Sequence, residues 1–260
     1  FRDEKGTLCF SPRKYIEKMI DGYLTIFGVK PKSNISSPLE KGDHPEIDDS
    51  ELLDSEWISI YQSLIGSLQW AISLGRMDIM TAVMSLSSFR HAPRKGHLNR
   101  TKRIYSYVSK MKHATIRVRV EEPDFSELPD EPYDWDHSIY GDVREEIPKD
   151  TPRPLGKFVV TTHYVDANLY HDIMTGRSVT GILHLINKTP LDWYSKKQAT
   201  VETATYGSEF VAGRTCTEQI MDIRTTLRYL GVPLREKCYM FGDNESVVNS
   251  ASIPHVKLHK

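Results

Sequence analysis

The sequence is poor in cysteine and has no long hydrophobic run, and both absences exclude classes of protein. Only Cys9, Cys216 and Cys238 occur among 260 residues, and no two of them form a Cys-x-x-Cys pair. This pattern favours a reducing compartment and supports neither a disulfide framework nor a zinc site. No apolar run approaches the roughly 18 residues of a membrane span, and no signal peptide is evident. We expect an intracellular protein, in a cytoplasmic particle or the nucleus, that is neither secreted nor membrane-bound.

The overall composition suits a globular protein of one or two domains, with 39% hydrophobic and 27% charged residues. The sequence begins at Phe1 and stops at Lys260, within a basic, histidine-containing stretch. We therefore expect it to be a fragment of a longer protein.

A net charge of −1 hides a strong asymmetry along the chain. Between Arg90 and Arg119 there are ten Lys or Arg residues and no Asp or Glu. A solvated helix face would explain such a run. With no acid nearby in sequence, however, intramolecular pairing should be scarce, which favours contact with nucleic-acid phosphates without sequence specificity. The candidate contacts are Arg100, Lys102 and Arg103.

An acidic block follows the basic one. Between Glu121 and Asp150 there are twelve Asp or Glu residues against two basic ones, together with four prolines. Such a composition is typical of an extended acidic linker or a surface insertion. We therefore divide the chain into a mostly helical region at 1–120, an acidic linker at 121–155 and a further domain at 156–260.

The periodicity of apolar residues changes between the two larger regions. Helical spacing before residue 115 predicts helices at about 12–27, 61–71, 78–89 and 97–111, after a short strand at 7–10. From Gly156 the pattern predicts strands at 157–166, 178–186 and 191–194, a helix at 204–230, a strand at 238–242 and a helix at about 244–252. A helix between the third and fourth strands lets the fourth return parallel to the first. The fold class is therefore α/β, with a mixed sheet.

Three carboxylates occupy positions that a metal-dependent nuclease would use. Asp166 ends the first apolar run, Glu209 lies early in the long helix, and Asp243 follows the fourth strand. The carboxyl ends of neighbouring parallel strands meet at one edge, so these acids should converge. Two divalent ions about 4 Å apart need such a shared set of oxygen ligands. Alternatively, Asp166 caps a turn, Glu209 is an ordinary exposed helix acid and Asp243 caps the last helix. The small residues around Glu209 favour a close approach to a sheet or a substrate: Gly207, Ser208, Ala212 and Gly213.

Several motifs in a fixed order resemble one family, the copia-type retrotransposon polyproteins. Five segments of the chain resemble the ribonuclease H region of this family. They are Tyr164-Val-Asp-Ala, Gly176-Arg-Ser-Val-Thr-Gly, Asp192-Trp-Tyr-Ser-Lys-Lys-Gln, Thr200-Val-Glu-Thr-Ala-Thr-Tyr-Gly-Ser-Glu-Phe and Phe241-Gly-Asp-Asn-Glu-Ser. Upstream, Phe10-Ser-Pro-Arg-Lys-Tyr and Tyr61-Gln-Ser-Leu-Ile-Gly-Ser-Leu-Gln-Trp resemble the thumb and connection of the family's reverse transcriptase. The resemblance implies a C-terminal domain of ribonuclease H fold after a mostly helical thumb and connection region.

The resemblance also implies an activity, which is hydrolysis of the RNA strand of an RNA·DNA hybrid with two Mg²⁺ ions, or with Mn²⁺. Asp166 would bridge both ions, and Glu209 and Asp243 would each complete one side. A histidine, His259, would help the product depart. Lys196, Lys197 and Gln198 would contact the hybrid backbone, unless they form a solvated turn. The other implied partner is the remainder of the reverse transcriptase polyprotein.

Two departures from the family pattern leave other functions open. The polymerase's own aspartate motif is absent, and the family's late fourth carboxylate would lie beyond Lys260. A non-catalytic nucleic-acid-binding remnant of a decayed retroelement is therefore an alternative, and an integrase-like or resolvase-like nuclease is another. The sequence makes no prediction about the oligomeric state.

Overall fold

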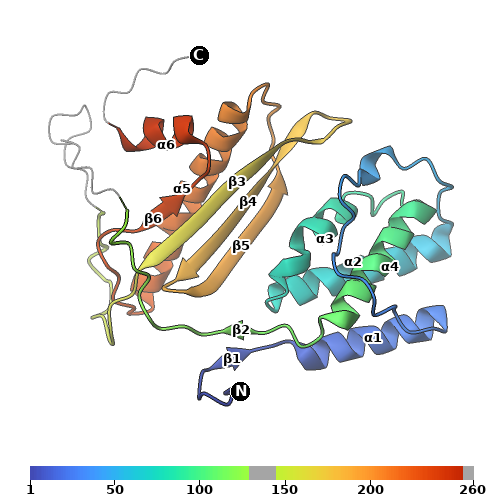
Figure 1. Cartoon of the computed structure of the whole chain (residues 1–260), viewed down its shortest axis with the longest axis horizontal. Helices are drawn as coiled ribbons and strands as arrows, with labels where there is room; N and C mark the ends of the chain where they lie inside the picture. Colours follow the sequence, from blue (N-terminus) through green and yellow to red (C-terminus); the bar gives the residue numbers. More distant parts are fainter. Residues whose placement is uncertain (129–144, 254–260) are drawn as a thin grey trace. The chain divides into compact units, whose positions relative to one another are not determined.

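The computed structural model describes residues 1–128 and 145–253, in two compact units. Unit 1 comprises Phe1–Val118 with the short segment Asp172–Thr175, and unit 2 comprises Arg119–His171 with the chain from Gly176 onward. Figure 1 shows unit 1 as a group of helices and unit 2 as a sheet with helices. Among the helices of the described ranges, none combines the length and hydropathy that crossing a bilayer requires.

Unit 1 is built on four α-helices, as the sequence predicts. Asp54 caps α2 by accepting a hydrogen bond from the Trp57 backbone N–H (2.9 Å), so this helix begins earlier than the apolar stripe indicated. Gly28 ends α1 in the left-handed conformation, with φ of 69°. The helices and short 3₁₀ turns are α1 (Arg13–Phe27), η1 (Pro45–Ile47), α2 (Ser55–Ser73), η2 (Met77–Ile79), α3 (Met80–Ser87) and α4 (Lys95–Lys110). Their apolar faces form the core, which includes Ile16, Tyr61, Leu64, Ile65, Leu68, Ile79, Leu86, Ile104 and Tyr105.

A two-stranded antiparallel ladder joins the two ends of unit 1. Strand β1 (Cys9–Phe10) pairs with β2 (Ile116–Arg117). The strand predicted at 7–10 is therefore confirmed in its second half. Its partner was not predicted, because two residues within a basic run are too few to show a period-two pattern.

Unit 2 is a mixed α/β domain, and its elements follow the predicted order. The sheet has the strand order β5-β4-β3-β6, with β5 antiparallel to β4 and β6 parallel to β3. The long helix between β5 and β6 provides the crossover that a parallel pair requires. The elements are β3 (Thr161–Asp172), β4 (Arg177–Ile186), β5 (Thr189–Lys197), α5 (Thr205–Tyr229), β6 (Tyr239–Phe241) and α6 (Glu245–Ser252).

The predicted end of the first strand is wrong. Strand β3 does not stop at Asp166 but continues to Asp172. The second half of β3 shows no apolar alternation in the sequence. It is extended because it is hydrogen-bonded to β4 in a hairpin, and most of its side chains are not buried. The parallel register with β6 covers residues 162–164 of β3. Asp166 therefore lies just past the parallel pairing, although it is inside the longer strand.

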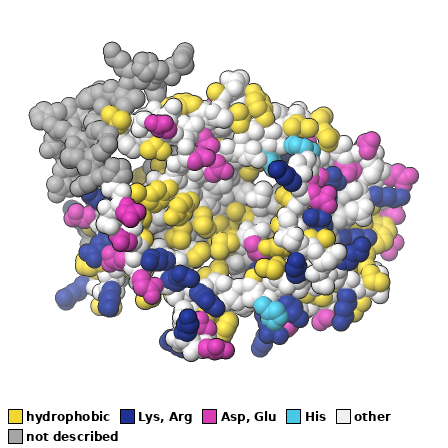
Figure 2. All heavy atoms as spheres, in the orientation of Figure 1, with side chains coloured by type: hydrophobic (Ala, Val, Ile, Leu, Met, Phe, Trp, Pro, Cys, Tyr) yellow, Lys and Arg dark blue, Asp and Glu magenta, His cyan; other side chains and the backbone are white. Residues whose placement is uncertain are grey.

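The two faces of the sheet differ. Helix α5 covers one face, where Ile182, Cys216 and Ile220 form a buried cluster. On the other face, Tyr164 stacks on Phe241 with ring centroids 5.3 Å apart. Figure 2 shows hydrophobic side chains gathered over the sheet on this uncovered side.

The described ends of the acidic segment lie along unit 2. Glu145 forms ion pairs with Arg224 and Arg228 of α5, and Glu122 pairs with Arg235. These contacts are typical of a segment packed on the domain surface. The middle of the predicted linker, residues 129–144, lies outside the described residues.

Candidate metal centre

The structure brings Asp166, Glu209 and Asp243 together, as predicted. One carboxylate oxygen of each lies within 4.8 Å of those of the other two. The three side chains come from β3, from the first turns of α5 and from the residue pair after β6. Positions far apart in sequence thus form one acidic cluster.

The pairing of β3 with β6 positions the two aspartates. Tyr164 is opposite Phe241 in the parallel register, so Asp166 and Asp243, each two residues further on, lie at the same level. The cap of α6 is Asn244, whose side chain accepts a hydrogen bond from the Val247 backbone N–H (3.1 Å). The alternative in which Asp243 serves as the cap is therefore wrong.

Glu209 is the most buried of the three acids. Its pKa is raised to about 7, mainly by burial and also by the charges of Asp166 and Asp243, although a hydrogen bond from the Ala167 backbone lowers it. The alternative of an ordinary exposed helix acid is excluded by this environment. A divalent cation would relieve the repulsion among three anionic groups, and hard oxygen atoms are the donors that such cations prefer.

The small residues near Glu209 differ in what they do. A Cβ on Gly207 would lie 2.6 Å from the Glu202 carboxylate, so this glycine makes room for Glu202 and not for the sheet. A Cβ on Gly213 would meet no atom within 4 Å. Ser208, Ala212 and Gly213 are buried.

Lys196, Lys197 and Gln198, at the end of β5, were predicted to contact nucleic acid, and they differ in orientation and burial. Lys196 and Lys197 are opposite Thr180 and Val179 of β4, so their side chains point to different faces of the sheet. Lys196 is exposed. Gln198, by contrast, is only 5% exposed. Contact of Gln198 with the hybrid stays a prediction, and its burial counts against it, because the amide nitrogen donates its hydrogen bonds inside the domain.

His259 lies outside the described residues. Its role in product departure stays a prediction. The same holds for the family's fourth carboxylate, which the resemblance places beyond Lys260.

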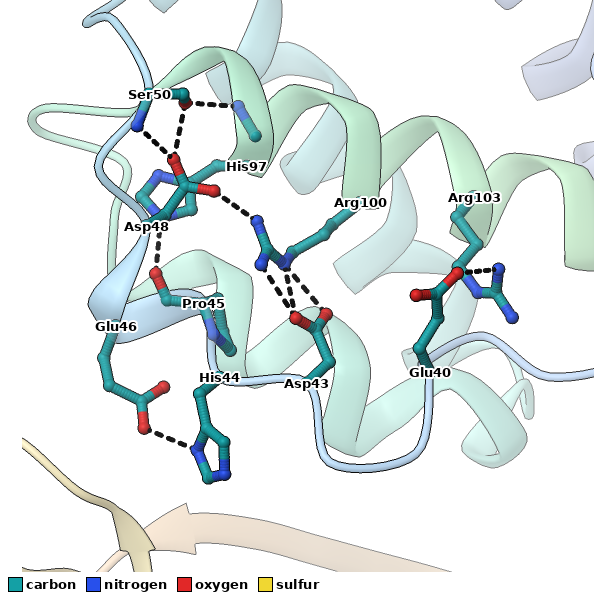
Figure 3. Close-up of polar contacts among 11 residues, drawn as sticks. Glu40, Asp43, His44, Pro45, Glu46, Asp48, Ser50, His97, Arg100 and Arg103 are labelled. Atoms are coloured by element: carbon teal, nitrogen blue, oxygen red, sulfur yellow. Dashed lines mark hydrogen bonds and ion pairs between the residues drawn. The ribbon is translucent and has the colours of Figure 1, made fainter.

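The basic helix α4 is extensively paired within unit 1, so the expectation of scarce intramolecular pairing is wrong. Arg100 forms ion pairs with Asp43 (2.8 Å) and Asp48 (2.5 Å), and Arg103 pairs with Glu40 (2.7 Å). Figure 3 shows these acids on the loop that runs beside α4. The partners come from residues 40–48, and proximity along the sequence could not reveal them. Nucleic-acid contact by Arg100 and Arg103 stays a prediction, and it would require phosphate to compete with these carboxylates.

A pocket of about 790 Å³ borders the same helix, and its lining includes Lys30, Lys32 and Lys102. The ammonium of Lys102 lies over the Phe27 ring, 4.4 Å from its centroid. Lys30 and Lys32 have no ion-pair partner among the described residues. These two lysines were not predicted as contacts, because they lie in a polar loop outside the basic run at 90–119.

The fold and the acidic cluster define a class, a mixed α/β domain with a three-carboxylate site suited to divalent cations. The chain is 24% identical over 259 residues to the retrovirus-related Pol polyprotein from transposon TNT 1-94 of Nicotiana tabacum, which covers 93% of this chain. It is 24% and 25% identical over 184 residues to the Pol polyproteins from transposons RE2 and RE1 of Arabidopsis thaliana, which cover 71% of it.

These similarities confirm the resemblance to retrotransposon polyproteins that the motifs indicated. The chain spans only 15% of the length of the tobacco polyprotein and 10% of each Arabidopsis polyprotein. No family model matches the chain, and no solved structure matches it significantly.

Proposed function

We propose that the chain is part of a retrotransposon polyprotein and that unit 2 is a ribonuclease H-like nuclease. In this proposal it hydrolyses the RNA strand of an RNA·DNA hybrid, while unit 1 corresponds to the thumb and connection of the reverse transcriptase. The observation that carries the proposal is the convergence of Asp166, Glu209 and Asp243 within 4.8 Å. The similarity to Pol polyproteins supports it independently.

The donor set fits two Mg²⁺ ions, or Mn²⁺. All three groups offer carboxylate oxygen, and the most buried one, Glu209, is held in an anionic environment that a cation would neutralise. Two divalent ions bound at such a site supply activation of water and stabilisation of the leaving oxygen. The protein's part is to fix the three carboxylates on a sheet and a helix, so that little reorganisation accompanies the reaction.

Substrate contact would come from basic side chains around the two units. Lys196 and Lys197 on β5 are the candidates in unit 2, and Lys30, Lys32 and Lys102 are candidates in unit 1. Contacts of this kind bind phosphates and carry no sequence information. Discrimination of the hybrid would need contacts to the RNA 2′-hydroxyl groups. An intracellular location would be consistent with such a substrate.

The substitution Asp166→Asn tests the proposal. It removes one anionic ligand while keeping the side chain's shape, so Mg²⁺-dependent cleavage of a labelled hybrid should fall to the level seen with a chelator present. The matched control is Asp222→Asn, an exposed acid of the same helix as Glu209 but about 20 Å further along it. Undiminished cutting by Asp166→Asn would refute the assignment. Absence of Mg²⁺-dependent cleavage by the longer polyprotein that contains the unsubstituted chain would favour the alternative, a non-catalytic nucleic-acid-binding remnant.

A further inference from the structure

Gln198 connects the sheet to the start of α5. It follows β5 and is 5% exposed. Its side-chain Nε2 donates hydrogen bonds to the Ser208 carbonyl (2.8 Å) and to Thr180 Oγ1 (3.1 Å). Its backbone N–H donates to the Ser178 carbonyl (2.8 Å). One side chain thus joins β4 to the first turn of the long helix.

The partner atoms fix the orientation of the amide. A backbone carbonyl can only accept, so the nitrogen and not the oxygen must point to Ser208. The Gln198 side-chain oxygen is then left buried and without a hydrogen-bond partner among the described residues. A buried unsatisfied oxygen carries a cost in stability. The presence of a glutamine at this position is therefore not explained by stability alone.

The position of Ser208 supplies that reason. It is fully buried, and the next residue is Glu209. Helix α5 begins at Thr205 without a side-chain cap, so its first turn lacks the usual tie. The two aspartates are set by the pairing of β3 with β6, whereas Glu209 depends on where this turn sits. Repulsion from Asp166 and Asp243 would push it away.

We propose that Gln198 is a positioning residue of the metal centre, which holds the Glu209 carboxylate against the two aspartates through the Ser208 carbonyl. This inference rests on the proposed function, because it assigns the purpose of the contact to cation binding. Gln198 does not touch the cation or the hybrid. This positioning role differs from the contact with the hybrid backbone that was expected for Gln198 as part of the Lys-Lys-Gln sequence.

The test compares two glutamines of unit 2. Gln198→Met keeps the side chain's length but removes both donated hydrogen bonds, and it also removes the unsatisfied oxygen. The control is Gln219→Met, since Gln219 accepts a hydrogen bond from buried His184 (2.9 Å) but lies about 15 Å further along α5 than Glu209. Mn²⁺ affinity of the 260-residue chain is measured by calorimetry, and folding by denaturant titration.

We expect Gln198→Met to bind Mn²⁺ about tenfold more weakly or worse, the usual effect of losing a group that orients a ligand. Cleavage of the hybrid should show a lower kcat with an unchanged KM. Gln219→Met should be the less stable variant, because it leaves Nε2 of the buried His184 without its hydrogen-bond partner, yet it should keep the original Mn²⁺ affinity. That pattern separates positioning from general stability.

Three results would overturn the inference. If both variants lose affinity equally, Gln198 acts only through stability. If Gln198→Met binds Mn²⁺ as well as the unsubstituted chain and cleaves equally fast, the positioning role is wrong while the proposed function stands. If the unsubstituted chain binds no Mn²⁺, both fail. Should Gln198→Met not fold, Thr180→Val replaces it, and unchanged affinity in that variant would count against the inference.

Discussion

At the scale of single residues, the environments of the charged groups separate structural from functional roles. Glu145 pairs with two arginines, and the hydrogen bond from Arg228 is the main cause that lowers its pKa to about 2. Among the described residues, the charges that shift the pKa of Glu209 come from two acids, Asp166 and Asp243, and its pKa is raised to about 7. Of the two carboxylates, the one without a basic side chain as partner, Glu209, is the stronger candidate for binding a metal ion.

The burial of His163 leads us to predict that unit 2 becomes less stable as the pH falls. Its ring is fully buried, with Nδ1 2.7 Å from Nδ1 of His184. Its pKa is lowered to about 3, mainly by burial and also by the charges of His184 and Arg224. Because this value is below the ordinary 6.5, the unfolded chain binds a proton between about pH 6.5 and 3 that the folded chain does not. The associated stability is complete above pH 6.5 and is lost as the pH falls.

The expected slope is at most about 1.4 kcal/mol per pH unit. Hydrogen-exchange protection of the β3 and β4 amides, measured from pH 7 to 5, reports on it. His163→Phe should flatten this dependence, whereas His113→Phe, which changes an exposed histidine of unit 1, should not. An equal slope in His163→Phe and the unsubstituted chain would mean that another group is responsible.

At the scale of elements, a charged cluster fixes the loop before α2 against α4. Asp48 accepts hydrogen bonds from Ser50 and Arg100, and a Cβ on Gly96 would lie 1.8 Å from its carboxylate. The glycine early in α4 is therefore required for this approach. The loop is held by polar contacts, and its own sequence shows no apolar period.

The substitution Arg100→Ala should destabilise unit 1 by about 2 kcal/mol, because it leaves Asp43 and Asp48 partly buried and unpaired. Arg100→Lys should recover only part of this loss, since an ammonium cannot reproduce the forked contact. Lys95→Ala is the control. It removes an ion pair with Glu51 in which the two side chains are 59% and 78% exposed, so it should cost much less stability than Arg100→Ala. Urea unfolding of the three variants, followed by the helical circular dichroism signal, checks the order.

At the scale of the whole molecule, the charge is balanced, with a net value of −1. Several basic side chains of the run at 90–119 form ion pairs within the protein, so attraction of the proposed hybrid would depend on a few lysines. This makes the predicted affinity for a hybrid modest and moderately dependent on salt.

The salt dependence can be tested through Lys196. If its ammonium contacts one phosphate, Lys196→Ala should reduce the slope of log K against log salt concentration by about one. Titration of a fluorescent hybrid at several salt concentrations, with Asp166→Asn to prevent cleavage, measures this slope. A slope that Lys196→Ala leaves unchanged would remove this residue from the interface.

The sequence by itself determined the order and type of most elements, since apolar periodicity records which face of each helix or strand is buried. It also determined which acids meet, because acids after parallel strands share an edge of the sheet. Tertiary structure alone decided that β3 extends to Asp172, that Arg100 and Arg103 are neutralised by residues 40–48, and that Gln198 is buried beneath the start of α5. Each of these depends on a contact between residues distant along the chain, and local patterns carry no record of such partners.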